Sequence, residues 1–358
     1  MSESNSLWHI AFRKFKTNRT GLFCLAYITI CGLVAVFCYL LAPDNSNNAN
    51  QMHLEIHSKP PGFSTLILKI PTGNKIPHNF FNTFLYGKTE PHSEIPIKSY
   101  VTKKNNLEVI QYSDGLTKTH SLSIFNNDPE SFIENKTFWL GTDKYGRDLL
   151  SRLLVGARIS FSIGFIAVFI SLIIGIPIGA FAGYFGGKID ALIMWVINIT
   201  WSIPTLLLVI AITLALGKGF WQVFIAVGLT MWVEVARVVR GQVIVTKEQQ
   251  YIEAAKALGF SDFRIIFKHI LPNILAPIIV ISAANFAAAI LIESGLSFLG
   301  IGAQPPTPSW GAMIKNHYNY IVLGKPYLAV IPGLAIMSLV MAFMLLGNTL
   351  RDVLDVKS

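Results

Sequence analysis

Few ionisable side chains interrupt the apolar stretches of this sequence, and those that do are the first candidates for chemistry. Glu234 lies three residues before Arg237, and Glu293 lies at the end of another apolar stretch. Because a charge in an apolar environment is costly, it must pair with another group or face water. The spacing favours an intrahelical pair for Glu234 and Arg237. Glu293 fits either a water-filled pathway or a structural hydrogen bond.

Recognised catalytic motifs do not occur in the sequence. Gly219 follows Lys218 where a phosphate-binding loop would need Ser or Thr, and neither HExxH nor GxSxG is found. We therefore predict that the chain is not an enzyme and binds no cofactor or metal of its own. His53 and His57 have the spacing of a metal pair, but their alternation with apolar residues favours a strand that carries histidines on its outer face.

The composition places these residues in a membrane protein. Of the 358 residues, 52% are hydrophobic and only 14% are charged, whereas soluble domains carry about 25% charged residues. This balance excludes a large cytosolic enzyme. A disulfide scaffold is excluded too, because all three cysteines lie in the first apolar block. The net charge of +9 therefore concerns membrane orientation and lipid contact, and we expect no nucleic-acid partner.

Six apolar blocks are long enough to cross a membrane as helices. This predicts an all-α polytopic membrane protein with six transmembrane helices. The expected spans are Gly21–Ala42, Ile159–Tyr184, Ala191–Leu216, Phe220–Ala236, Ile274–Glu293 and Tyr327–Gly347. The first block is longer than the core of a signal peptide and lacks a cleavage site, so we interpret it as an uncleaved anchor.

Basic residues in the short connections predict the orientation. The N-terminal tail carries Arg13, Lys14, Lys16 and Arg19, and the segment between the fourth and fifth blocks carries Arg237, Arg240, Lys247, Lys256, Arg264 and Lys268. The connection at residues 217–219 has only Lys218. Because positive charge favours the cytoplasmic side, we expect both termini to be cytoplasmic.

This orientation predicts five parts. They are a basic tail at 1–20, the first span at 21–42, an extracytoplasmic insertion at 43–138, a transmembrane core at 139–350 and a C-terminal tail at 351–358. Apolar alternation within the insertion predicts strands at Glu94–Thr102, Leu107–Tyr112 and Thr117–Phe125, with turns at 103–106 and 113–115. We therefore expect a small β-rich insertion.

Residues 247–272 form a cytoplasmic loop that is too long for a simple link. Gly259 ends a strong helix-forming stretch, and Ser261 can begin a second short helix. In the first helix, Tyr251, either Ala254 or Ala255, and Leu258 share one face. Such a face fits a groove of another protein. The alternative is an amphipathic helix that rests on lipid headgroups.

This loop resembles the EAA loop of ABC-importer permeases. The matching residues are Glu253, Ala254, Ala255, Gly259, Leu271 and Pro272. The resemblance extends to the dipeptide and oligopeptide permeases of the DppC/OppC type. It rests on residues 139–158, with Asp143, Arg147, Asp148, Arg152 and Gly156, on Trp232 and 236–242, and on 293–300 and 308–311.

The resemblance implies half of a translocation pathway in the bacterial inner membrane. It implies a second homologous permease subunit, ABC ATPase subunits that use ATP and Mg, and an extracytoplasmic substrate-binding protein. The loop at 247–272 would couple to the ATPase, through Tyr251 and Leu258 as well as the EAA residues. Glu293, Asp143 and Arg147 are the candidates for the pathway or its outer gate. For Asp143 and Arg147, a structural ion-pair network with Asp148 and Arg152 is the favoured alternative.

Two other classes of protein are consistent with parts of the sequence. A membrane-anchored sensor would use 43–138 to bind a ligand and the cytoplasmic loop to signal, but it would not need six spans. A secondary transporter would need no ATPase, but the sequence shows no convincing internal repeat. The sequence does not distinguish dipeptides, oligopeptides, nickel or other small solutes as the substrate.

Overall fold

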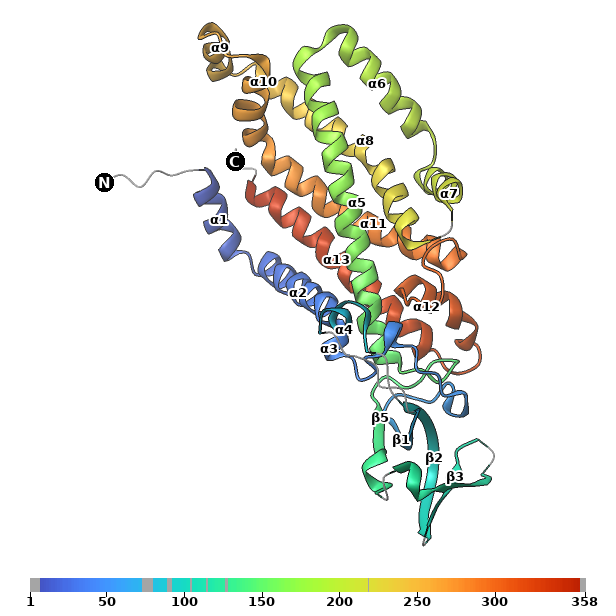
Figure 1. Cartoon of the computed structure of the whole chain (residues 1–358). Helices are drawn as coiled ribbons and strands as arrows, with labels where there is room; N and C mark the ends of the chain where they lie inside the picture. The colour runs from blue at the N-terminus through green and yellow to red at the C-terminus, as the bar shows by residue number, and fades with distance from the viewer. Residues whose placement is uncertain are drawn as a thin grey trace, which may run out of the picture. The chain divides into compact units, whose positions relative to one another are not determined.

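Most of the described chain forms α-helices (Figure 1), and several of the longest are apolar enough to cross a membrane. The computed structural model describes residues 7–72, 80–88, 92–103, 105–113, 115–125, 128–217 and 219–354. Lys104 and Asp114 of the predicted turns, Lys218, and the outer ends of both predicted tails lie outside these ranges.

Thirteen α-helices are found among the described residues. They are α1 Leu7–Thr17, α2 Arg19–Val36, α3 Cys38–Leu41, α4 Phe80–Tyr86, α5 Leu149–Phe185, α6 Gly187–Ser202, α7 Thr205–Leu216, α8 Phe220–Lys247, α9 Gln250–Ala257, α10 Asp262–Arg264, α11 Leu275–Leu299, α12 Trp310–His317 and α13 Tyr327–Leu354. A π-helical turn at Ile265–Ile270 and a 3-10 turn at Leu271–Ile274 connect α10 to α11.

Five helical stretches of the described chain are long and apolar enough to span a membrane. They are Arg19–Val36, Leu149–Phe185, Phe220–Lys247, Asp262–Leu299 and Tyr327–Leu354. The pair α6 and α7 makes a sixth candidate, but it bends by 90° between Ser202 and Thr205. Pro204 lies in this break, as expected from a residue that cannot donate a backbone hydrogen bond. The predicted third span is therefore broken rather than straight.

Two of the predicted boundaries differ substantially from the structure. The helix α5 begins at Leu149, ten residues before the predicted second span, and α8 continues to Lys247 rather than ending near Ala236. Polar residues at these ends reduce the local hydropathy without interrupting the helix. Both helices are therefore longer than their apolar content alone predicted.

The described residues fall into two compact units. The first unit comprises the described parts of 1–32, 160–304 and 335–358, and the second comprises those of 33–159 and 305–334. The core of the first unit includes a cluster in which α5 and α8 contact α9 and the turns that follow α10. A second cluster of this unit joins α5, α7, α8 and α11.

The second unit contains a five-stranded antiparallel sheet with the order β4-β3-β2-β1-β5. The strands are β1 Phe63–Pro71, β2 His92–Lys103, β3 Asn106–Gln111, β4 Thr117–Ser121 and β5 Ile133–Phe138. The three predicted strands correspond to β2, β3 and β4, although Leu122–Phe125 is a 3-10 turn. The strands β1 and β5 were not predicted. A hydrophobic cluster that includes Leu68, Ile97, Leu107, Val109 and Phe125 forms the core of the sheet.

The predicted strand around His53 and His57 was wrong. Residues Leu54–Ile56 form a 3-10 turn, and His53 is buried rather than outward-facing. Ile56 is also buried, whereas Leu54 is exposed. The alternation of residue types therefore reflects a tight turn and not the two faces of a strand.

Candidate functional site

The segment 247–272 folds into two short helical elements, which we call the knob. The first element, α9, ends in a Schellman motif: the backbone N–H of Phe260 donates to the carbonyl of Ala255, and that of Gly259 donates to Lys256. Gly259 has φ of +77°, a conformation that costs other residues about 1–2 kcal/mol. The predicted helix end at Gly259 is therefore present, and glycine is favoured there because it adopts a positive φ without strain.

One face of α9 is exposed. Tyr251, Ala254 and Leu258 lie on this face, and the side chain of Leu258 is 73% exposed. Ala255, the alternative to Ala254, is buried instead. Glu253 is exposed in the first helical turn, where a carboxylate interacts favourably with the helix dipole.

The opposite side of the knob is buried against the long helices of the first unit. Ile252 and Ala255 of α9 and Ile265, Ile266 and Ile270 share one apolar cluster with residues of α5 and α8. Leu271 packs against this cluster, whereas Pro272 is exposed at the first turn of the 3-10 segment. Because α10, the two turns and α11 form one helical stretch, the knob is continuous with a candidate span.

Polar contacts also join the knob to α5. The hydroxyl of Tyr184 donates a hydrogen bond of 2.6 Å to Asp262 of α10. The Lys256 ammonium lies 5.5 Å from the centre of the Tyr184 ring. These contacts supplement the apolar cluster, so that the knob and the end of α5 form a single packed element.

Three glycines in α5 allow its backbone to lie very close to α8. Gly175, Gly179 and Gly183 recur every four residues and therefore share one helix face. A Cβ atom at Gly175 would lie 2.7 Å from the carbonyl oxygen of Trp232, and one at Gly183 would lie 2.7 Å from that of Arg240. At Gly179 it would meet the backbone of Ala236. These glycines therefore allow close packing of the two helices.

Two arginines of α8 bind residues of α6. The guanidinium of Arg240 donates two hydrogen bonds, of 2.5 and 2.6 Å, to Asp190. Arg237 lies over the ring of Trp201 at 3.5 Å and donates to Asn198. Each arginine thus turns toward the neighbouring helix, and no ion pair between Glu234 and an arginine is found among the described residues. The expected intrahelical pair of Glu234 was wrong.

Asp143 and Arg147 form a buried ion pair in the second unit. The carboxylate of Asp143 accepts a 2.7 Å hydrogen bond from Nε of Arg147 and lies 3.7 Å from Nε of Arg152. Arg147 also donates to Asn50 at 2.9 Å. Asp148 accepts hydrogen bonds from the backbone and side chain of Ser151. Asp143, Arg147 and Arg152 therefore form part of the ion-pair network that was the favoured alternative, whereas Asp148 bonds to Ser151. A pathway role for Asp143 and Arg147 stays a prediction.

Two motif segments that are distant in sequence meet in the second unit. The indole N–H of Trp310 donates a 2.9 Å hydrogen bond to the carbonyl of Leu153. A Cβ atom at Gly156 would lie 2.9 Å from the Trp310 ring. Glycine at 156 therefore makes room for the tryptophan.

Glu293 is buried in α11 and accepts a 2.6 Å hydrogen bond from Ser297. The Ser297 hydroxyl in turn accepts one from the backbone N–H of Ala303. The carboxylate thus takes part in the connection that follows α11. Its role in a pathway stays a prediction.

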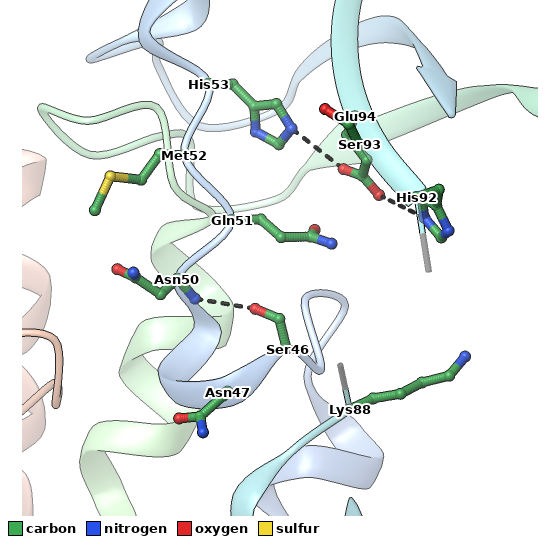
Figure 2. Close-up of a pocket in the computed structure, with 10 residues that line it drawn as sticks. All are labelled: Ser46, Asn47, Asn50, Gln51, Met52, His53, Lys88, His92, Ser93 and Glu94. Carbon is green, nitrogen blue, oxygen red and sulfur yellow. Dashed lines mark hydrogen bonds and ion pairs between the residues drawn. The ribbon is translucent and has the colours of Figure 1, made fainter. Parts of the chain in front are cut away.

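A polar pocket of about 390 Å³ lies beside the sheet of the second unit (Figure 2). The Glu94 carboxylate lies between His53, at 3.2 Å, and His92, at 3.7 Å, and accepts a hydrogen bond from Lys136 at 3.1 Å. Burial raises the pKa of Glu94, but His53 and Lys136 more than compensate and lower it to about 2. Within the described ranges, no three His, Cys, Asp or Glu side chains form a group that could hold a metal.

Comparisons with known proteins identify the family. A sequence model described as a binding-protein-dependent transport system inner membrane component matches residues 175–357. A model of the N-terminal transmembrane domain of oligopeptide transport permease C matches residues 6–61. Both matches agree with the resemblance found in the sequence motifs.

Similar proteins include the glutathione transport system permease protein GsiD of Shigella flexneri and of Pectobacterium atrosepticum. They are 47% and 42% identical over 219 residues, which are 61% of this chain and 72% of each relative. Among solved structures, the inward-facing methionine transporter MetNI is 20% identical with a TM-score of 0.47, covering 56% of this chain and 96% of that one. The sensor alternative is not favoured. The chain belongs to the binding-protein-dependent transport system inner membrane components, as an ABC-importer permease of the dipeptide and oligopeptide type.

Proposed function

We propose that the knob is the element through which this permease docks on its ATPase subunits. The observation that carries the proposal is that one side of α9 is exposed while the other is buried. Tyr251, Ala254 and Leu258 are exposed, while Ile252 and Ala255 on the other side are buried. A helix with a small residue between two larger ones can approach a groove closely. The exposed face is therefore available to a partner without disturbing the permease core.

The buried side of the knob explains how docking would be transmitted. Its isoleucines pack with α5 and α8, and its second element continues into α11. Closely packed interiors transmit displacement because they resist compression. When ATP binding brings the ATPase subunits together, the knob would move as a rigid body and tilt the attached helices. ATP and Mg would be bound by the ATPase subunits and not by this chain.

The cargo that we propose is glutathione or another short peptide. Support comes from the similar permeases, which are named for glutathione transport, and from the match to the oligopeptide permease domain. A second homologous permease would complete the pathway, and an extracytoplasmic binding protein would deliver the peptide. Glu293, Asp143 and Arg147 are proposed for the pathway or its outer gate.

The proposed topology has six spans, with α6 and α7 together counted as one broken span. Both termini and the knob would be cytoplasmic, as the arginine and lysine distribution indicates. The β-sheet insertion would then lie on the outer side of the inner membrane. There it could contact the binding protein or cover the outer mouth.

Uptake into vesicles tests the proposed function. The chain would be reconstituted with its permease partner, ATPase subunits and binding protein, and labelled glutathione, a dipeptide and free methionine would be offered. We expect ATP-dependent uptake of glutathione or the dipeptide that requires every subunit. Uptake of neither peptide by an assembly that hydrolyses ATP would contradict the proposed cargo. Peptide uptake without ATPase subunits would contradict the proposed energy source.

A further inference from the structure

The short helix α4 presents large apolar side chains that are largely exposed. Phe80 and Phe81 are 71% and 72% exposed, and Leu85 and Tyr86 are also exposed. With Phe84, the residues Phe80, Phe81 and Leu85 share one helix face. Such a concentration of apolar surface on a short helix is typical of a contact site rather than of a water-facing surface.

A single arginine attaches α4 to the end of the first candidate span. The guanidinium of Arg158 donates to the carbonyl oxygens of Ala35 at 3.0 Å and Val36 at 2.8 Å, which are the last residues of α2. It also donates to the carbonyl oxygens of Leu85 at 2.7 Å and Phe84 at 3.3 Å. One side chain thus satisfies the final carbonyl groups of two helices, which otherwise lack partners.

Further contacts fix α4 beside the same span end. The rings of Phe84 and Phe37 meet edge to face, with centroids 5.8 Å apart. After α4, the backbone N–H of Lys88 donates to the carbonyl of Asn45 at 2.7 Å. Gly87 lies so close to this segment that a Cβ atom would be 2.8 Å from the carbonyl oxygens of Asn45 and Ser46. The helix is therefore held at the level of residues 35–46, where α2 and α3 end, beside α3 (Figure 1).

The exposed face of α4 continues an apolar surface of the chain itself. Val36, Phe37, Leu40 and Leu41, at the end of the first span and in α3, are exposed as well. In an inner-membrane protein the exposed surface of a span faces lipid. At the end of a span, aromatic side chains favour the boundary between hydrocarbon and headgroups. We propose that α4 is an interfacial anchor that inserts Phe80, Phe81 and Leu85 into the lipid leaflet at the end of the first span opposite the N-terminus.

The partner that this surface fits is lipid rather than a binding protein or a second permease. The hydrogen bonds of Arg158 hold α4 beside the last residues of α2, so that its apolar face lies where the hydrocarbon begins. The anchor would also hold the loop between the first span and the sheet, because Lys88, two residues after α4, bonds to Asn45 in that loop. This role is independent of the cargo and of the orientation of the chain.

Collision accessibility of spin labels tests the proposal in the assembled transporter, reconstituted into vesicles of phosphatidylethanolamine and phosphatidylglycerol. Labels are placed singly by Phe81→Cys and Leu85→Cys after Cys24, Cys31 and Cys38 are replaced by alanine. The matched control is Val101→Cys, an exposed apolar residue of β2. Oxygen concentrates in lipid, whereas a nickel chelate stays in water. Each variant is first checked for insertion and for co-purification of its partners.

Lipid insertion predicts that positions 81 and 85 are more accessible to oxygen and less accessible to the nickel chelate than position 101. Nickel accessibility at 81 and 85 equal to that at 101 would place α4 in water and overturn the proposal. Low accessibility to both reagents would show that a protein covers α4, and this would overturn it too. Because two positions on one face are measured, local disruption by one label does not decide the result.

Discussion

The hydroxyl group of Tyr184, at the end of α5, donates a 2.6 Å hydrogen bond to Asp262, at the start of the second element of the knob. Both residues belong to the first unit. Asp262 is exposed, whereas Tyr184 is buried against the cluster beneath α9. The bond therefore joins the long helix to the part of the knob that continues into α11.

Tyr184→Phe tests whether this bond transmits motion. Loss of the hydrogen bond should reduce the free energy that holds the knob against the helix by about 1–2 kcal/mol. We expect normal assembly and ATP hydrolysis, but less peptide carried for each ATP hydrolysed. The control is Tyr27→Phe, which removes a 2.7 Å hydrogen bond to Ser338 elsewhere in the same unit. An unchanged transport-to-hydrolysis ratio in Tyr184→Phe, or an equal fall in Tyr27→Phe, would contradict this role.

Gly179→Ala tests the close packing of α5 on α8. The added methyl group would collide with the backbone of Ala236, and such overpacking costs about 1–3 kcal/mol. We expect a lower thermal unfolding midpoint in detergent. Gly241→Ala is the matched control, because a Cβ atom there has open space, and alanine favours the helix. If the two substitutions shift the midpoint equally, the proposed role of the glycine face is wrong.

Gly259→Val and Gly259→Asn separate backbone conformation from side-chain size at the turn of the knob. Asparagine tolerates a positive φ better than other residues, and valine tolerates it poorly. We expect Gly259→Val to weaken co-purification with the ATPase subunits, because the direction of α9 depends on this turn, and Gly259→Asn to retain most of it. Equal loss in both variants would mean that the turn does not act through its conformation.

The contacts of Glu94 predict a pH dependence of the sheet. A pKa of about 2 in the folded chain, below the ordinary value of 4.5, means that the ionised carboxylate stabilises the fold above pH 4.5. This contribution, about 3 kcal/mol at neutral pH, is lost as the pH falls from 4.5 toward 2.

Hydrogen exchange of the β1 and β2 amides, corrected for intrinsic rates, measures this effect. Glu94→Gln should reduce protection of these amides at pH 7. As the pH drops below 4.5, protection in this variant should fall less than in the wild type. The control is Glu134→Gln, since the Lys69–Glu134 pair is exposed and such pairs contribute about 0–1 kcal/mol. Equal protection in wild type and Glu94→Gln at pH 7 would refute the assignment.

Local patterns predicted the features that depend on local physics. The helix-forming residues before Gly259 predicted the end of α9. Pro204 lies where the third span breaks, and a proline inside an apolar block is a local signal of such a bend. The exposed side of α9 was predicted only as a choice between Ala254 and Ala255. Periodicity could not decide, because the two positions lie on opposite edges of the face that Tyr251 and Leu258 define, at similar angles from its centre.

Long-range contacts were not predictable from spacing. Arg240 pairs with Asp190, fifty residues earlier, and Arg158 binds carbonyl groups of α2 and α4. Gly183 could have been found, because it extends the four-residue repeat of Gly175 and Gly179. The strands β1 and β5 pair with each other across more than sixty residues, and neither has a clear two-residue alternation. His53 was misplaced because its partner Glu94 is distant in sequence.

The central claim is that the exposed face of α9 docks on the ATPase, and Leu258→Asp tests it most directly. Leu258 is 73% exposed, so a carboxylate there should leave the permease fold intact. Leu323→Asp is the matched control, with the same chemistry at a leucine that is 67% exposed outside the knob.

The measurement is the affinity of the purified permease complex for its ATPase subunits. An apolar residue at the centre of an interface typically contributes about 1–2 kcal/mol or more, so we predict an affinity at least about tenfold lower for Leu258→Asp and unchanged for Leu323→Asp. Wild-type affinity in Leu258→Asp would show that α9 does not dock through this face.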